Sequence, residues 1–312
     1  MVQNTVERFL NKTITAEILL ITVTFFWGTT FFLVKSSLEI IPPFAFLSIR
    51  FSLASLFVIP IFILQKNNKI ALIRHSIEKS LIIGIFLWIS FAFQTIGLQY
   101  TSSTVAAFIT GMNVIITPIL AVLLFRYHIS MKAIGGAILA FLGLSLLSGI
   151  FEIDLNNQMD NLQLWGNILV FICAIAIAFH ILYTEKYAPS IDPFFLMSVQ
   201  VIVAAVLSLG LSLIVGELKI QYLNPFNWNL TLWVTLIITI FFATIFAYLV
   251  QSYYQGKKLV TGSRVALIFS FEPIFAALTG YIFLQESLSL LSTLGALLVF
   301  IAMILARPTD LN

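Results

Sequence analysis

The chain has 312 residues, of which 60% are hydrophobic and only 9% are charged, and its mean hydropathy is +1.06. Soluble domains carry about a quarter charged residues, so this composition excludes an ordinary soluble protein and indicates an integral membrane protein. The formal charge of +3 is small and no basic block is dense, which argues against a nucleic-acid partner.

The polar N-terminal segment, MVQNTVERFLNKTITAE, is too long for a secretory signal, and the apolar run after it does not end at a cleavage site, so we expect it to be retained. A membrane-crossing helix needs about 20 mostly apolar residues. Short breaks such as 100–102 and 285–287 predict tight antiparallel hairpins. The apolar runs predict ten spans, at residues 17–37, 44–64, 80–99, 103–126, 133–150, 165–184, 193–215, 231–254, 264–284 and 288–306.

The distribution of Lys and Arg predicts the orientation, because these residues collect in short loops on the cytoplasmic side. With the N-terminus inside, nearly all of the 16 basic residues fall in inner segments. The outer segments hold only Lys219, while Lys35 and Arg50 lie within spans near the outer face. We therefore predict a plasma-membrane protein, in bacteria the inner membrane, with both termini cytoplasmic.

An internal repeat divides the spans five and five at the longest outer segment, residues 151–165. An offset of 150 places IIPPFAFLS (40–48) over SIDPFFLMS (190–198), and an offset of 159 places 105–121 over 264–280, where the few identities are also explained by apolar composition. A copied five-span unit must enter the membrane from the opposite side. We predict an all-α polytopic protein of ten transmembrane helices in two inverted five-helix repeats, 1–150 and 165–312, joined by an outer loop at 151–164.

Four stretches of the chain match a known family in order. They are FFWGTTFFLVK (25–35), PPFAFLSIRFSLA (42–54), LQYTSSTVAAFITGMNVIITPILA (98–121) and SRVALIFSFEPIFAALTGYIFLQESLS (263–289). With them the chain resembles the EamA-type members of the drug/metabolite transporter superfamily over essentially its whole length. The resemblance implies a ten-span inverted-repeat carrier, often an exporter of amino acids or related metabolites, with a central cavity lined by the first, third and fourth spans of each half.

Glu272 lies near the middle of the ninth predicted span and is followed by Pro273. A charge at the bilayer centre costs about 2.5–3.5 kcal/mol on insertion scales, so Glu272 should face protein or water. It either exchanges a proton or binds a substrate ammonium, since burial and nearby charge both change the protonation of a carboxyl group, or it is a protonated structural residue. Pro273 cannot donate to the carbonyl of Phe269, so we expect a helix kink there, for a polar site or for packing alone.

Other polar and aromatic residues within spans are candidates for the cavity. Asn113 falls opposite Glu272 in the repeat register and Thr110 lies one turn earlier; both either line the cavity or hold helices together. His180 is either a hydrogen-bonded packing residue or a proton relay with Glu272, and Arg50 either snorkels outward or pairs with Glu39. The predicted cavity-lining residues are Trp27, Gln94, Thr110, Asn113, Tyr248, Gln251, Phe269 and Glu272, with Trp27 and Phe269 as apolar walls.

Together with what the resemblance implies, these features predict a monomeric secondary transporter that exports amino acids or related small metabolites by alternating access, either coupled to protons or passive. We expect no enzyme activity, no cofactor and no metal, because no Cys/His cluster, glycine-rich phosphate loop or paired carboxylates stand out. Two alternatives remain, a non-transporting membrane scaffold and a carrier for nucleotide-activated sugars. The second would need several basic groups facing the cavity.

Overall fold

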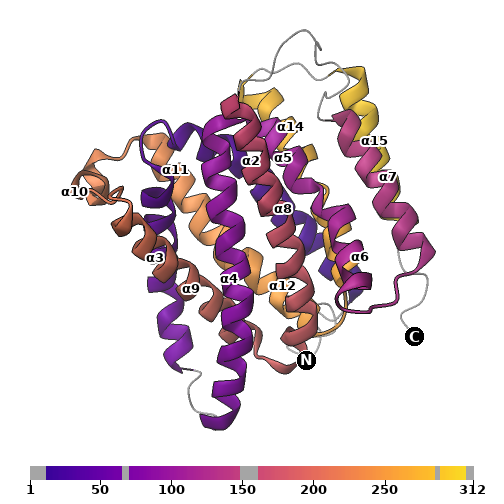
Figure 1. Cartoon of the computed structure of the whole chain (residues 1–312), viewed down its shortest axis with the longest axis horizontal. Coiled ribbons are helices and arrows are strands. Elements are labelled where there is room, and N and C mark those ends of the chain that lie inside the picture. Colours follow the sequence, from indigo (N-terminus) through magenta and orange to yellow (C-terminus); the bar gives the residue numbers. More distant parts are fainter. Residues whose placement is uncertain (1–11, 65–69, 148–160, 285–288, 307–312) are drawn as a thin grey trace, which may run out of the picture.

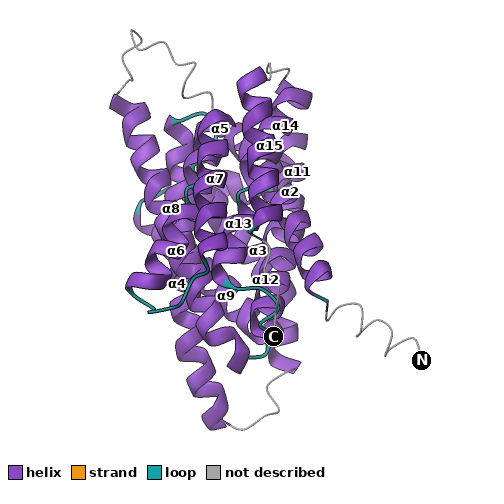
Figure 2. Cartoon of the chain, turned by 90° about the vertical axis from the view of Figure 1, so that its right-hand side faces the viewer, coloured by secondary structure: helices purple, strands orange, loops and turns teal. Residues whose placement is uncertain are grey.

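The structure is a computed structural model that describes residues 12–64, 70–147, 161–284 and 289–306. All regular structure in these ranges is helical, as Figure 2 shows, so the all-α prediction is confirmed there. The predicted N-terminal segment, the loop at 151–164 and the break at 285–287 lie wholly or mostly outside the described residues. The helices of the first half are α2 (Thr13–Ser37), α3 (Pro43–Leu64), α4 (Ile70–Tyr100), α5 (Ser103–Gly111), α6 (Asn113–Leu123) and α7 (Met131–Leu147).

The second half contains more helical segments, because two of its predicted spans are divided and three short segments lie between spans. They are α8 (Asn161–Tyr187), η1 (Ala188–Ser190), α9 (Pro193–Ile214), α10 (Ile220–Leu223), η2 (Pro225–Asn227), α11 (Leu230–Ile237), η3 (Ile238–Phe246), α12 (Ala247–Gly256), α13 (Gly262–Phe269), α14 (Glu272–Leu284) and α15 (Leu290–Leu305). The segment η3 is a π-helix that joins α11 to α12.

Eight of the ten predicted spans correspond to helical segments that are long and apolar enough to cross a membrane. The other two correspond to the shorter apolar helices α7 and α15, which lie side by side at the right of Figure 1. The chain is therefore an integral membrane protein. α4 begins ten residues before its predicted span, because charged residues such as Lys79 interrupt the apolar run without interrupting the helix.

The helix bounds repeat at the two offsets that the sequence shows. α3 and α9 both have 22 residues and begin at proline, and their bounds differ by 150. The pairs α5 and α13, and α7 and α15, begin 159 residues apart. Their N-terminal caps also correspond: Ser102 accepts from the Val105 N–H, Thr261 from the Arg264 N–H, and Ser130 and Ser289 cap α7 and α15 in the same way.

Two predicted spans are interrupted at equivalent places. The fourth divides into α5 and α6 at Met112, and the ninth divides into α13 and α14 at Ser270 and Phe271. Pro273 lies in the first turn of α14, where its missing N–H has no intrahelical partner to lose. Asn113 and Glu272 are therefore the first residues of the two second segments.

Helices pack pairwise, α3 against α9, α4 against α8, α7 against α15 and α2 against α14. Glycines allow close approach at several crossings. A Cβ at Gly295 would lie 2.5 Å from the Gly143 carbonyl oxygen, and one at Gly97 would lie 2.8 Å from the Gly166 carbonyl oxygen. Small residues at these crossings bring the backbones close, as is typical of membrane helix packing.

Candidate functional site

A small cavity of about 30 Å³ lies between the two halves of the bundle. Such a volume holds about one water molecule. Its walls come from α2, α4, α8, α12, α13 and α14. The lining residues are Trp27, Thr30, Leu87, Ser90, Phe91, Gln94, Cys173, Ile177, His180, Tyr248, Gln251, Phe269 and Glu272. We call this space the central cavity.

Six of the predicted cavity residues lie at the central cavity, and two do not. Trp27, Gln94, Tyr248, Gln251, Phe269 and Glu272 are in its lining, together with His180. Thr110 and Asn113 lie one layer behind it. The Gln94 Nε2 donates to Thr110 Oγ1 at 3.3 Å, and the Asn113 Nδ2 donates to the Thr110 carbonyl at 2.8 Å. Asn113 thus closes the turn at the interruption between α5 and α6.

Four aromatic rings surround much of the central cavity. The Trp27 ring centroid lies 4.7 Å from that of Phe269 and 5.8 Å from that of Tyr248, and the Phe91 and Tyr248 centroids are 6.2 Å apart. Phe91 was not predicted, although it lies one turn from Gln94 on the same helical face. Aromatic faces attract organic cations, especially where water is excluded.

Glu272 supplies the carboxyl group of this cavity. Its side chain is buried, and with the described residues it makes no hydrogen bond or ion pair. As the first residue of α14, it lies at the N-terminal end of a helix, where the helix dipole favours a negative charge. The cavity therefore combines aromatic rings with a carboxyl group that is available to a ligand.

The aromatic wall is fixed from behind by the π-helix η3. The Trp27 Nε1 donates to the Ala243 carbonyl at 2.9 Å. Buried Arg50 donates through Nη2 to Thr244 Oγ1 at 2.9 Å, and its guanidinium carbon lies 4.3 Å from the Phe91 ring centroid. Arg50 therefore adopts neither of the two predicted arrangements, snorkelling outward or pairing with Glu39, because η3 presents polar groups at its depth.

His180 reaches the central cavity from α8 and is held by a hydrogen-bonded chain. Its Nε2 lies 2.7 Å from Gln200 Oε1, and it donates there in the tautomer that carries its proton on Nε2. The Gln200 Nε2 in turn donates to the Leu196 carbonyl and to Ser252 Oγ. The imidazole orientation is therefore fixed by α9 and α12.

A second and much larger cavity, of about 1110 Å³, opens at the side predicted to be cytoplasmic. We call it the vestibule. Its basic lining residues come from three segments far apart in the chain: Arg126 and Lys132, Lys186, and Lys258 and Arg264. Glu185 is the acidic residue among its lining residues. The sequence did not predict this cavity.

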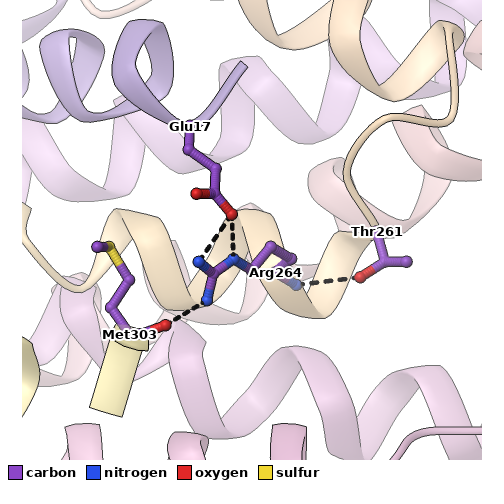
Figure 3. Close-up of polar contacts among 4 residues, drawn as sticks. All are labelled: Glu17, Thr261, Arg264 and Met303. Carbon is purple, nitrogen blue, oxygen red and sulfur yellow. Dashed lines mark hydrogen bonds and ion pairs between the residues drawn. The ribbon is translucent and has the colours of Figure 1, made fainter. Parts of the chain in front are cut away.

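A buried ion pair lies at the wall of the vestibule (Figure 3). Glu17 Oε1 accepts from Arg264 Nη2 at 2.7 Å and from Nε at 3.0 Å. The Arg264 Nη1 donates to the Met303 carbonyl at 2.6 Å. One guanidinium thus ties α2, α13 and α15 together at this end of the bundle.

Charged side chains also hold the C-terminal end of α2 and the N-terminal end of α3. The Lys35 Nζ donates to the carbonyls of Leu98 and Thr101 at 2.6 and 2.7 Å. Glu217 Oε2 accepts from the Phe44 N–H at 2.7 Å and so caps α3, because the preceding residue Pro42 has no side-chain oxygen that could accept this bond. Such contacts hold helix ends together on both sides of the central cavity.

The described residues contain no group of three or more His, Cys, Asp or Glu side chains that could hold a metal ion. What they contain is a bundle of apolar helices with two interrupted spans around a buried site that is both polar and aromatic. This combination is typical of membrane transporters.

The chain belongs to the EamA-like transporter family, whose model matches it twice, at residues 14–149 and 164–307. This confirms the resemblance to the drug/metabolite transporter superfamily. An uncharacterized transporter of Archaeoglobus fulgidus is 31% identical over 94% of this chain and 86% of its own length. A WAT1-related chloroplastic protein of Arabidopsis thaliana is 26% identical over 94% of this chain and 69% of its own.

One solved crystal structure covers 94% of this chain and 96% of its own, with a TM-score of 0.69 and 14% sequence identity. At that identity the likeness concerns the fold alone.

Proposed function

We propose that the protein is a secondary transporter that exports amino acids or related small metabolites through the central cavity. The observation that carries the proposal is the juxtaposition of the Glu272 carboxyl group with the rings of Trp27, Phe91, Tyr248 and Phe269. A substrate ammonium would be attracted both by the carboxylate and by the aromatic faces. Membership of a transporter family supports the general activity.

Alternating access is the mechanism that we propose. Pockets for small ligands have volumes of roughly 300 Å³ or more, about ten times that of the central cavity. The site must therefore enlarge to admit an amino acid. The two family matches and the helix bounds that repeat at offsets of 150 and 159 support two inverted five-helix repeats, whose relative movement would open the site to each side in turn.

Flux into proteoliposomes tests the proposal, with a panel of amino acids and amines, with and without a pH gradient. If Glu272 exchanges a proton, Glu272→Gln will keep some flux but lose its dependence on the pH gradient. If Glu272 only binds the ammonium, the apparent affinity will fall at every pH. Glu39→Gln is the matched control, because Glu39 is an exposed glutamate at the predicted outer surface. Flux of Glu272→Gln equal to the wild type under all conditions would refute the role of Glu272.

The remaining parts of the proposal follow from the sequence. We propose a monomer in the plasma membrane, the inner membrane in bacteria, with cytoplasmic termini, that works without a cofactor and either with or without protons. A carrier for nucleotide-activated sugars would need basic groups at the substrate, whereas the lining of the central cavity contains neither lysine nor arginine. A non-transporting scaffold predicts no flux for any compound.

A further inference from the structure

The central cavity and the vestibule share three walls. On each of three helices, one residue lines the central cavity, and a second residue, at most five positions away, lines the vestibule. These pairs are His180 and Glu185 on α8, Gln251 and Gln255 on α12, and Phe269 and Leu267 on α13. The two spaces are therefore stacked along the same helices. On α12 the two lining residues are four positions apart, which is about one helical turn and a rise of about 6 Å.

Two glutamines fill that turn. The Gln251 Nε2 donates to Gln255 Oε1 at 2.9 Å, and the Gln255 Nε2 donates to the Ile181 carbonyl of α8 at 3.0 Å. Both side chains are only 1% exposed. Gln251 Oε1 is buried without a hydrogen-bond partner among the described residues. The pair thus joins α12 to α8 between the two spaces.

We propose that the vestibule is the inner antechamber of the substrate path and that Gln251 and Gln255 form the barrier between it and the central cavity. This proposal rests on the proposed transport function. A side-chain amide pair suits such a barrier, because an amide can exchange its partner for a substrate carboxylate, water or another amide without leaving a charge buried. Turning Gln255 away from Ile181 would connect the two spaces.

The charges of the vestibule refine the substrate class. Arg126, Lys186 and Lys258 are exposed in it and give it a positive potential. Arg126 and Lys258 each adopt a φ of 56°, a left-handed conformation that is uncommon for residues other than glycine. A positive antechamber concentrates anions and repels simple cations. Because the central cavity favours an ammonium group, the two together select a compound that carries both a carboxylate and an ammonium, rather than an amine alone.

The chain contains its own reporter for this path. Cys173 is its only cysteine, and it lines the central cavity. Its rate of modification by membrane-impermeant methanethiosulfonate reagents measures entry into that cavity. The reagents are applied separately to inside-out and right-side-out vesicles. An anionic sulfonatoethyl reagent is compared with a cationic trimethylammonioethyl reagent of similar size.

In the wild type we expect slow modification of Cys173 from both faces of the membrane. Gln255→Ala removes the barrier and should raise the rate at least tenfold from the vestibule face alone. Gln255→Met fills the space without the hydrogen bonds and should give a smaller increase. Gln221→Ala, at an exposed glutamine of α10, is the matched control and should leave the rate unchanged. In the Gln255→Ala background, replacing Lys186 and Lys258 together by Glu should lower the rate of the anionic reagent relative to that of the cationic reagent.

If the Cys173 modification rate is unchanged in both Gln255 variants, or rises equally from both faces of the membrane, the proposal that Gln251 and Gln255 form the barrier is wrong. Gel filtration and Tm of each variant separate a local opening from misfolding. If the ratio of the anionic to the cationic modification rate is unchanged in the variant with Lys186→Glu and Lys258→Glu, the proposal that the vestibule is a charged antechamber is wrong. Labelling needs no known substrate. If no amino acid is transported but the Cys173 modification rates change as expected, the proposed substrate is wrong and the proposed path is supported. If amino acids are transported but the modification rates do not differ among the variants, only the proposed path is wrong.

Discussion

Gly28 is the residue at which helix packing and the central cavity are most directly linked. It lies in α2 against the start of α14. A Cβ at this position would lie 2.6 Å from the Glu272 carbonyl oxygen, 2.6 Å from Phe275 Cβ and 2.9 Å from the Ala276 nitrogen. Since ordinary contacts begin at 3.4 Å, Gly28→Ala requires a separation of about 0.8 Å between the helices. Two of the three neighbours are backbone atoms, so a rotamer change cannot relieve the contact.

Overpacking of this kind costs about 1–3 kcal/mol. Alanine in place of glycine within a helix also gains about 1 kcal/mol from helix propensity, which would partly hide the cost. Gly210→Ala in α9 provides the matched control, because a Cβ at Gly210 has nothing within 4 Å. The difference between the two variants isolates the steric cost, and we expect Gly28→Ala to be the less stable by about 1–3 kcal/mol.

Denaturation of both variants in the same detergent measures this difference, and proteoliposome flux measures its effect on the site. Because the displaced backbone carries Glu272, the apparent substrate affinity of Gly28→Ala should fall, while that of Gly210→Ala should not change. A Gly28→Ala protein as stable as Gly210→Ala, with unchanged flux, would refute the close contact between α2 and α14 and the argument built on it.

Three further contacts described above can be tested by substitution. Glu17→Gln leaves the Arg264 guanidinium buried without its charge partner and should lower the free energy of unfolding by about 3–5 kcal/mol, whereas Glu17→Leu combined with Arg264→Met should recover most of that loss in the same denaturation assay. Glu217→Ala removes the cap of α3 and should cost about 1 kcal/mol; an equal loss in Glu39→Ala would show that the effect is unspecific. Trp27→Phe keeps an aromatic ring but removes the donor to the π-helix carbonyl, and we expect a loss of about 1 kcal/mol together with weaker substrate binding; unchanged stability and affinity would contradict the anchoring role.

The helices could be predicted from the sequence because membrane spans are contiguous apolar runs. The two-residue break between α4 and α5 is an example: Thr101 and Ser102 interrupt the run where the chain turns, and Ser102 caps the next helix. The π-helix at 238–246 could not be predicted, because its residues are as apolar as those of a regular helix. Trp27 and Arg50 donate hydrogen bonds to it from other helices, and such long-range contacts leave no local signal in its sequence.

The candidate site could be predicted in part, for a related reason. Gln94, Gln251 and Glu272 are conspicuous because polar side chains are rare inside apolar spans. Phe91 was not distinguishable among 30 phenylalanines. The vestibule combines segments that are distant in sequence, so no local pattern indicates it. The same holds for the ion pair of Glu17, whose partner lies 247 residues away.

Asn113 and Glu272 open equivalent helical segments with different chemistry. In the proposed inverted arrangement, a carrier with two identical halves would have inward-facing and outward-facing states of equal energy, because exchanging the halves exchanges the states. Positions where the halves agree preserve that equality, and positions where they differ remove it. In such a carrier, an amide in one half and a carboxyl group in the other would make the energy difference depend on the protonation of one side chain. The resting population of the two states would then shift with pH even before a substrate binds.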